Sequence, residues 1–593
     1  MTPETDTYTL LRAFVDELAR CGMRAACTSP GSRNTPLVLS LAREQRLRSY
    51  SHVDERCAGF FALGLAKASG LPVAVTCTSG TAAAELLPAV VEAYEARVPL
   101  LLLTADRPPE LRENGAGQAI DQLKLFGGAA KWFFDVGPHD ASPERLRWMR
   151  TLACRAYWSA LEGRPGAVHL NFALREPLVT EEQLPVDDSA RADGRPYVSR
   201  PSRPAAAAAL DSRLFELIAG ARRGVLIAGR HERDSPLGEA AAAFTQATSW
   251  PLLADPLSGA RRGPTAVAHY DALLREQSFA NWATPDLVIR VGDLPVSKPL
   301  RSWLAKLGGA RQIALDSECA WQDPASVLTD CLAIDPVDGL TQLTAALAQS
   351  DDGAGSSSDE DWLARWRSAD ELAAEALLGI LSEGLSEPAV AAELGVLLPE
   401  QATLFVASSM PVRDIETFWP VRADPPRALC NRGANGIDGT VSSAFGAAAA
   451  GDGPVVLLIG DVALAHDIGG LLAARRTGLK LTIVLIDNDG GGIFDFLPVS
   501  SASMARETGS PWGADADLYT HHVATPTGLD FAQAAALFDL AHERVEDVEG
   551  FRVALERALV REESSIVEVR TARAENVATH RRAWRAVASA LTA

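Results

Sequence analysis

Two apolar runs in the C-terminal third of the chain end in residues that could bind a metal ion. GPVVLLIGD ends at Asp461, and the next run, LTIVLID, is followed by Asn488 and then by a glycine turn beginning at Gly490. A carboxylate, an amide oxygen and a backbone carbonyl are the hard oxygen donors that Mg²⁺ prefers. If the two runs are neighbouring parallel strands, we expect these three groups to meet in the crevice at the carboxyl ends of the strands.

Local sequence leaves two further interpretations open. Two ordinary strand-to-helix turns could carry these residues without binding any ligand. The string IVLIDNDGG also resembles the strand–DxDG start of the haloacid-dehalogenase-type phosphatases, in which the first Asp is the nucleophile. That family favours Thr or Val after the glycine, whereas Gly491 stands at this position.

The elements that must position these residues alternate throughout the chain between apolar strands and helical stretches. Strand–helix alternation predicts parallel sheets covered by helices on both faces. Two segments rich in small and polar residues, 184–206 and 350–360, are typical of linkers. We therefore predict an α/β fold of three doubly wound parallel-sheet domains in series, covering residues 1–185, 206–350 and 361–593.

Composition narrows the class of protein further. The 593 residues contain 56 basic and 76 acidic side chains, a net charge of −20 that argues against nonspecific nucleic-acid binding. We find no apolar run long enough to span a membrane and no signal peptide at the start. The eight cysteines are scattered without CxxC pairs, which favours reduced thiols. We expect a cytoplasmic protein.

The Gly-Asp pair followed by Asn488 resembles the motif of thiamine-diphosphate-dependent enzymes. This resemblance implies that Asp461, Asn488 and the carbonyl of Gly490 hold Mg²⁺ or Mn²⁺, which in turn binds the cofactor's diphosphate. The acids on either side of Asn488 depart from the consecutive asparagines that the family often carries here.

Thiamine chemistry also needs a carboxyl group bonded to the cofactor's pyrimidine ring. Glu55 lies between a short strand (49–53) and an Ala/Gly-rich helix (58–68), in an order of features that resembles the pyrimidine-binding domain of the superfamily. The resemblance implies that Glu55 is the catalytic acid. Alternatively, the acids here could be a solvated cap at a helix start.

Five further motifs resemble the 2-succinyl-5-enolpyruvyl-6-hydroxy-3-cyclohexene-1-carboxylate synthases of menaquinone biosynthesis. They are CTSPGSRNTPLVLSL (27–41), TADRPPELRENGAGQAIDQ (104–122), SSMPVRD (408–414), NRGANGIDG (431–439) and DGGGIFDFLP (489–498). The implied reaction is decarboxylation of 2-oxoglutarate and 1,4-addition of the resulting succinyl carbanion to isochorismate. Both substrates are small dicarboxylates.

The same resemblance assigns the remaining site residues. Those expected at the cofactor are Ser408, Ser409, Ile437, Gly460, Val462, Ala463 and Ile493. Those expected at the substrates are Ser32, Arg33, Arg107, Gln118, Lys298, Arg413, Arg432 and Leu497. Arginine is suited to this task because its guanidinium binds carboxylates through two parallel hydrogen bonds. Pro299 stands where some relatives have a second base, and Arg301 is a candidate to replace it.

The resemblance also implies a homodimer, or a dimer of dimers, whose sites lie at the subunit interface. Another thiamine-diphosphate enzyme, such as an acetohydroxyacid synthase or a 2-oxoacid decarboxylase, would share the fold and the cofactor. A phosphatase of the Asp-nucleophile class and a non-enzymatic α/β scaffold are two further hypotheses.

Overall fold

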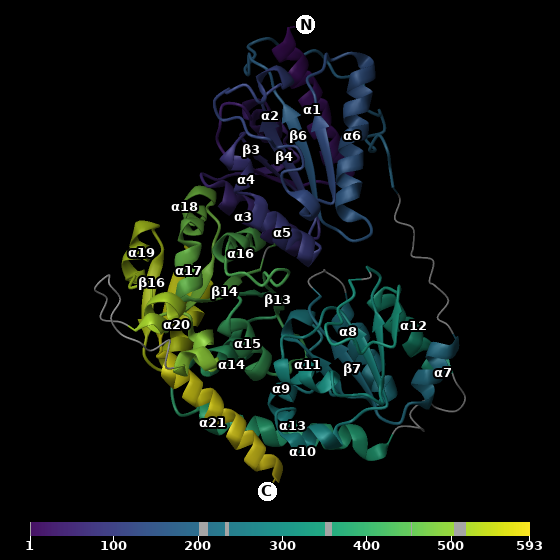
Figure 1. Cartoon of the computed structure of the whole chain (residues 1–593), viewed down its shortest axis with the longest axis vertical. Coiled ribbons are helices and arrows are strands. Elements are labelled where there is room, and N and C mark those ends of the chain that lie inside the picture. Colours follow the sequence, from purple (N-terminus) through teal and green to yellow (C-terminus); the bar gives the residue numbers. More distant parts are fainter. Residues whose placement is uncertain are drawn as a thin grey trace.

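The computed structural model describes residues 2–200, 212–231, 236–318, 320–349, 359–451, 453–502 and 517–592. Figure 1 shows three α/β bodies that follow one another along the chain, coloured purple to blue, teal, and green to yellow. Each contains one parallel sheet with helices around it, so the predicted fold class of three α/β domains in series is confirmed. Within the described ranges, no helix is long and apolar enough to cross a membrane.

The first domain has a six-stranded parallel sheet in the order β2-β1-β3-β4-β6-β5. Its strands are β1 (Ala25–Thr28), β2 (Arg48–Ser51), β3 (Val73–Cys77), β4 (Leu100–Asp106), β5 (Trp132–Val136) and β6 (Ala167–Ala173). Its helices are α1 (Pro3–Cys21), α2 (Thr35–Arg43), α3 (Glu55–Ser69), α4 (Thr81–Ala84), α5 (Leu87–Ala96) and α6 (Pro143–Leu161), with 3₁₀ turns η1 (Pro109–Leu111) and η2 (Gly127–Ala129).

The central strand β4 shows why this sheet is covered on both faces. All of its residues are buried. Leu100 and Leu102 pack with residues of α3 and α5, whereas Leu101 and Leu103 pack with residues of α1 and α6. Because side chains alternate between the faces of a strand, a continuous apolar run needs helices on both sides.

The middle domain has five parallel strands in the order β11-β10-β9-β7-β8. The strands are β7 (Gly224–Ala228), β8 (Leu252–Ala254), β9 (Leu287–Val291), β10 (Arg311–Leu315) and β11 (Asp330–Leu332). The helices are α7 (Ser212–Gly220), α8 (Leu237–Thr248), α9 (Tyr270–Leu273), α10 (Gln277–Trp282), α11 (Lys298–Leu304) and α12 (Pro336–Gln349), with the 3₁₀ turn η3 (Pro256–Ser258).

The third domain repeats the strand order of the first, as β13-β12-β14-β15-β17-β16, again with every pairing parallel. Its strands are β12 (Thr403–Val406), β13 (Arg427–Leu429), β14 (Val455–Gly460), β15 (Thr482–Asp487), β16 (Ala541–Val545) and β17 (Ser565–Arg570). Its helices are α13 (Glu360–Leu381), α14 (Glu387–Leu397), α15 (Met410–Phe418), α16 (Thr440–Ala448), α17 (Asp461–His466), α18 (Leu472–Thr477), α19 (Phe531–Leu537), α20 (Val548–Val560) and α21 (Arg573–Thr592). Shorter turns are η4 (Ile468–Leu471), η5 (Gly492–Phe496), η6 (Pro498–Ser501) and the π-helical η8 (Thr520–Ala524).

Helices α3 and α16 join the first domain to the third (Figure 1). A Cβ atom on Gly64 would lie 1.9 Å from the carbonyl oxygen of Ser443, and one on Gly446 would lie 2.0 Å from that of Phe61. The Ser443 hydroxyl donates a hydrogen bond to the carbonyl of Phe60 at 3.1 Å. The two helices therefore approach so closely that only glycine fits at these crossing points.

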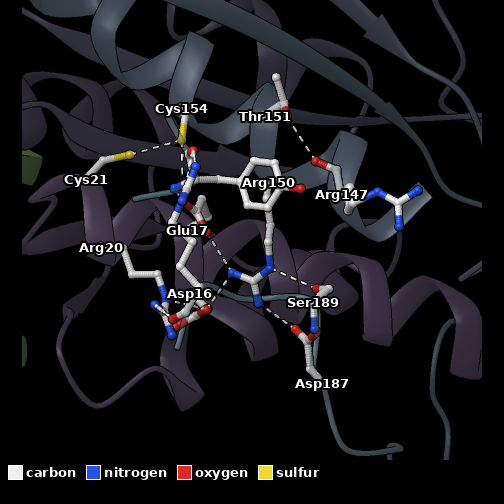
Figure 2. Close-up of polar contacts among 12 residues, drawn as sticks. Asp16, Glu17, Arg20, Cys21, Arg147, Arg150, Thr151, Cys154, Asp187 and Ser189 are labelled. Atoms are coloured by element: carbon white, nitrogen blue, oxygen red, sulfur yellow. Dashed lines mark hydrogen bonds and ion pairs between the residues drawn. The ribbon is translucent and has the colours of Figure 1, made fainter. Parts of the chain in front are cut away.

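The described part of the first predicted linker is held against the first domain by a buried arginine (Figure 2). Arg150 of α6 is 1% exposed and pairs with Asp16 and Glu17 of α1. It also pairs with Asp187 at 2.6 Å and donates to the hydroxyl of Ser189 at 2.9 Å. Burial of a guanidinium needs such a complete set of acceptors. The linker segments 201–206 and 350–358 lie outside the described residues, so the predicted domain boundaries stay predictions.

Candidate active site

Asp461 and Asn488 follow two strands that are neighbours in the third sheet. Strands β14 and β15 pair in register, with Gly460 opposite Ile486. The Asp461 carboxylate accepts the N–H of Gly490 at 2.8 Å, which places the glycine turn beside it. The expected crevice at the carboxyl ends of these strands is therefore present.

The donor set at this crevice fits a cation. The Nδ2 of Asn488 donates to Glu387 at 2.9 Å, and its Oδ1 is buried with no hydrogen-bond partner among the described residues. A buried acceptor without a partner is costly unless a cation or a donor fills the place. Burial, and then the charges of Asp487 and Asp489, raise the pKa of Asp461 to about 6. A bound cation would offset the cost of burying this carboxylate.

The acids that flank Asn488 are near this donor set but are not part of it. Asp487 forms an ion pair with Arg570 at 3.2 Å, and Asp489 is exposed with a φ of 62°. The cavity here is lined by Ile486 and Asn488 but not by Asp487. The phosphatase hypothesis, which needs this Asp as the nucleophile, is not favoured.

The residues expected at the cofactor line the same cavity, which has a volume of about 450 Å³. Ser409 precedes α15 with a φ of 77°, and the Ser408 hydroxyl donates to the carbonyl of Asn431 at 3.3 Å. N–H groups at the start of such a helix are suited to binding phosphate. The expected residues found here are Ser408, Ser409, Ile437, Gly460, Asp461, Val462, Ala463, Asn488, Gly490 and Ile493.

An adjoining cavity of about 540 Å³ collects positive charge. Five residues line both this cavity and the cavity of Asp461: Arg301, Met410, Arg413, Arg432 and Ile493. Lys298 and Leu497 line the adjoining cavity only. In the described part of the chain, no acidic side chain lies within ion-pair distance of Lys298, Arg301, Arg413 or Arg432.

The guanidinium groups in this cavity repel one another. Burial and the charge of Arg432 lower the pKa of both Arg301 and Arg413. Arg413 also donates a hydrogen bond to the carbonyl of Ser409. Two acids also line this cavity, but Asp271 pairs with Arg275 and Glu416 pairs with Arg261. The remaining cations therefore favour an anionic ligand. Arg301 lines this cavity and Pro299 does not. That Arg301 replaces the missing base stays a prediction.

Glu55 is the first residue of α3, and the structure separates its role from that of Asp54. The Asp54 side chain accepts the backbone N–H groups of Arg56 and Cys57, so Asp54 is the helix cap. Glu55 instead lines a cavity of about 450 Å³. Burial, and to a lesser extent the charges of Asp54 and Glu85, raise the pKa of Glu55. The interpretation as a helix cap therefore applies to Asp54 alone.

The predicted substrate residues of the first domain line the cavity of Glu55. They are Ser32, Arg33, Arg107 and Gln118. Arg33 is buried and already pairs with Glu176 at 2.8 Å. Arg107 donates to the Ser79 hydroxyl at 3.0 Å and to the carbonyl of Gly117 at 2.7 Å, and its pKa is lowered by burial and by Arg33.

The two groups of predicted residues do not meet within one chain. The cavity of Glu55 is lined by residues between positions 30 and 176, whereas the cavity of Asp461 is lined by residues between 301 and 494. Five of the predicted residues line the cavity of Glu55, and the others line the cavity of Asp461 or the one that adjoins it.

Sequence reasoning missed several residues at these cavities. Glu85 and Glu176 line the cavity of Glu55, Glu387 and Asn435 line the cavity of Asp461, and His580 lines the cavity that adjoins the latter. Burial and the charge of Asp414 raise the pKa of Glu387 to about 7. The only local signal for Glu387 is its place at a helix start, in LSEPAV, which is equally typical of an acid that stabilises the helix.

Comparison with known proteins agrees with this geometry. Residues 8–125 match the family described as thiamine pyrophosphate enzyme, N-terminal TPP binding domain. Residues 192–406 match the middle domain of thiamine pyrophosphate enzymes, and residues 413–569 match their C-terminal TPP binding domain. The chain is a thiamine-pyrophosphate-dependent enzyme.

The chain's relatives show which group of thiamine-pyrophosphate-dependent enzymes it belongs to. The chain is 44% identical over 582 residues to the 2-succinyl-5-enolpyruvyl-6-hydroxy-3-cyclohexene-1-carboxylate synthase of Geobacillus kaustophilus, covering 97% of each chain. It is 43% identical to the enzyme of the same name from Chloroflexus aurantiacus, covering 98% of this chain and 96% of the relative. The corresponding Listeria monocytogenes enzyme is 41% identical, with 98% of each chain covered. The chain belongs to the family of 2-succinyl-5-enolpyruvyl-6-hydroxy-3-cyclohexene-1-carboxylate synthases.

Proposed function

We propose that this enzyme decarboxylates 2-oxoglutarate and adds the remaining four-carbon unit to isochorismate, forming 2-succinyl-5-enolpyruvyl-6-hydroxy-3-cyclohexene-1-carboxylate for menaquinone biosynthesis. The observation that carries the proposal is the cluster of Lys298, Arg301, Arg413 and Arg432 beside the cofactor cavity. Four cations without acidic partners among the described residues, in a chain of net charge −20, suit substrates that carry two carboxylates each.

The cofactor, the catalytic acid and the metal ligands would each have a separate role in this reaction. Thiamine diphosphate, when bound, supplies the nucleophilic carbon and the electron sink for decarboxylation. Glu55 would hold a hydrogen bond to the pyrimidine ring, for which its raised pKa is suited. Asp461, Asn488 and the carbonyl of Gly490 would hold Mg²⁺ or Mn²⁺, because all three donors are oxygens.

The remaining predicted residues would bind and enclose the ligands. Ser408 and Ser409 would donate to the diphosphate, while Ile437 and Ile493 would form apolar walls that exclude water. Arg33, Arg107, Gln118 and Ser32 would approach the substrates from the pyrimidine side.

The assembly that we propose is a homodimer, or a dimer of dimers, with each site completed by two chains. Support comes from the separation of the cavities of Glu55 and Asp461. Apolar side chains are also exposed on the domain that carries Glu55. They are Val53, Leu87, Val91, Ile120 and Leu123. Val53, Leu87 and Ile120 each stand two positions from a residue that lines the cavity of Glu55. Exposed apolar groups of this kind are typical of an interface.

We propose a cytoplasmic location. Cysteine usage supports it, because no disulfide joins any of the cysteines within the described residues.

The direct test is turnover by the purified protein supplied with 2-oxoglutarate, isochorismate, thiamine diphosphate and Mg²⁺. We expect product formation and sustained CO₂ release to require all four, because the acceptor is needed to complete each turnover. Equal turnover of pyruvate in place of 2-oxoglutarate would instead support an acetohydroxyacid synthase or a 2-oxoacid decarboxylase.

A variant tests the cation cluster. Arg413→Ala removes a charge-assisted hydrogen bond from the substrate cavity, so we expect kcat/KM for 2-oxoglutarate to fall at least about tenfold. Arg367→Ala, on the exposed face of α13, is the matched control and should leave kcat/KM unchanged. Equal rates in both variants would remove Arg413 from the substrate site.

A further inference from the structure

Glu387 is a buried carboxyl group that no predicted role accounts for. It is the first residue of α14, is 3% exposed and lines the cavity that contains Asp461. Its Oε1 accepts two hydrogen bonds, from Nδ2 of Asn488 at 2.9 Å and from the hydroxyl of Thr571 at 3.1 Å. A buried carboxyl group is costly, so its presence here needs a reason.

The bond from Asn488 determines which end of its amide faces the cavity. A side-chain amide has a donor end and an acceptor end that are nearly equal in shape. Because Oε1 of Glu387 accepts, the NH₂ end of Asn488 must face it. The Oδ1 of Asn488 is then turned away from Glu387 and is buried, and no residue in the described part of the chain forms a hydrogen bond with it.

The surroundings of Glu387 hold it in this position. Its second partner, Thr571, follows β17, and the Thr571 N–H donates to the carbonyl of Asp487 at 3.0 Å. Strands β15 and β17 pair in register there, with Asp487 opposite Arg570. Glu387 therefore bridges the ends of two adjacent strands, one of which is followed directly by Asn488. The helix start is also fixed, because Ser386 accepts the N–H of Ala389 at 3.3 Å.

We propose that Glu387 is a positioning residue that turns the amide oxygen of Asn488 toward the divalent metal ion. This inference rests on the proposed function of Asp461, Asn488 and Gly490 as the metal site. Glu387 acts through Asn488 and is not itself a ligand. Groups that orient metal ligands commonly contribute 10- to 100-fold to metal affinity.

The test measures the affinity of the protein for Mn²⁺ in the presence of thiamine diphosphate, by electron paramagnetic resonance of free Mn²⁺. Glu387→Met keeps the packing but removes the acceptor, and we expect Mn²⁺ to bind about 10- to 100-fold more weakly. Glu387→Gln removes the charge but keeps an acceptor, and we expect it to retain most of the affinity. Equal weakening in both variants would show that charge alone matters and would overturn the positioning role.

A reversed pair gives a second measurement of the positioning role. In the double variant Glu387→Gln with Asn488→Asp, the amide and the carboxylate exchange places, so the donor now comes from position 387. We expect this pair to bind Mn²⁺ more tightly than the double variant Glu387→Met with Asn488→Asp, which carries the same charge but has no donor at position 387. No gain in the reversed pair would contradict the proposal.

Failure of the inference is distinguishable from failure of the proposed metal site. If the parent enzyme does not bind Mn²⁺ with thiamine diphosphate, the metal site itself is wrong. If the parent binds Mn²⁺ and Glu387→Met binds it equally well, only the positioning role is wrong. Thr571→Val is a graded comparison, because it removes the other partner of Glu387 and leaves the bond to Asn488. We expect a loss of at most a few-fold, smaller than that of Glu387→Met.

Discussion

At the scale of single residues, the neighbouring acids Asp54 and Glu55 have different roles, because only Asp54 caps helix α3. Asp54 satisfies the first N–H groups of α3, and Glu55 is left to face a cavity. Burial raises the pKa of Glu55, which makes its protonated form more accessible near neutral pH. A carboxyl group of this kind is suited to share a proton with a ring nitrogen.

We predict that Glu55→Gln lowers turnover at least about 100-fold, because an amide keeps the shape of the side chain but cannot exchange a proton. Thiamine diphosphate binding, measured by calorimetry, should change little. Asp54→Ala is the control: it should cost about 1 kcal/mol of stability through loss of the cap and affect turnover less. Near-normal turnover by Glu55→Gln would show that Glu55 is not the catalytic acid.

His169 makes the stability of the first domain depend on pH. Its ring lies between Phe126 and Phe133, with Nε2 2.8 Å from the Thr104 hydroxyl, and burial lowers its pKa to about 3. The unfolded chain takes up a proton at this residue below its ordinary pKa of about 6.5, whereas the folded chain does not. Stability is therefore lost as pH falls from about 6.5 toward 3.

We predict that His169 alone accounts for about 2 kcal/mol of the stability lost between pH 7 and pH 5. His169→Gln, which can keep a bond to Thr104, should show a smaller fall in the thermal unfolding midpoint over this range. Midpoints measured at both pH values in parent and variant check this. An identical fall in the two proteins would show that His169 does not cause the dependence.

At the scale of elements, the contact of α3 with α16 decides how the first and third domains are joined. A Cβ atom on Gly64 would lie 1.9 Å from a backbone oxygen of α16, so the helices would have to separate. We predict that Gly64→Ala destabilises the protein by about 1–3 kcal/mol or more.

Gly379→Ala is the matched control for this prediction. Gly379 lies within α13, and a Cβ atom there would meet nothing within 4 Å. Alanine is the better helix former, so this variant should be neutral or more stable by up to about 1 kcal/mol. Thermal unfolding of both variants checks the pair, and equal midpoints would contradict the close packing of the two helices.

At the scale of the whole molecule, the separate cavities of Glu55 and Asp461 lead to a prediction about assembly. If a site is completed by two chains, a mixed dimer of Glu55→Gln and Asp461→Ala has one site with both lesions and one with neither. Random pairing makes about half of the dimers mixed, so about a quarter of parental activity should return on co-expression.

The measurement is turnover of the mixed dimer, purified through a different tag on each chain. Each variant alone serves as the control and should be inactive. A mixed dimer that binds cofactor but shows no turnover would mean that both residues of a site belong to one chain.

The sequence by itself determined the α/β class and the types of residue at the site. Continuous apolar runs such as Leu100–Leu103 need cover on both faces, and the motifs around Asp461 and Asn488 predicted the oxygen donors that the structure brings together at one sheet edge. These inferences succeed because strand periodicity and strand-end chemistry are local properties of the chain.

Tertiary structure alone decided the strand order, the cap at Asp54 and the role that we infer for Glu387. Glu387 contacts Asn488 from 101 positions away in the chain. Tertiary structure also decided that the cavities of Glu55 and Asp461 are lined by different parts of the chain. Such contacts depend on how distant elements pack. The residues around Glu387 are those of an ordinary helix start, so the local sequence did not indicate its contact with Asn488.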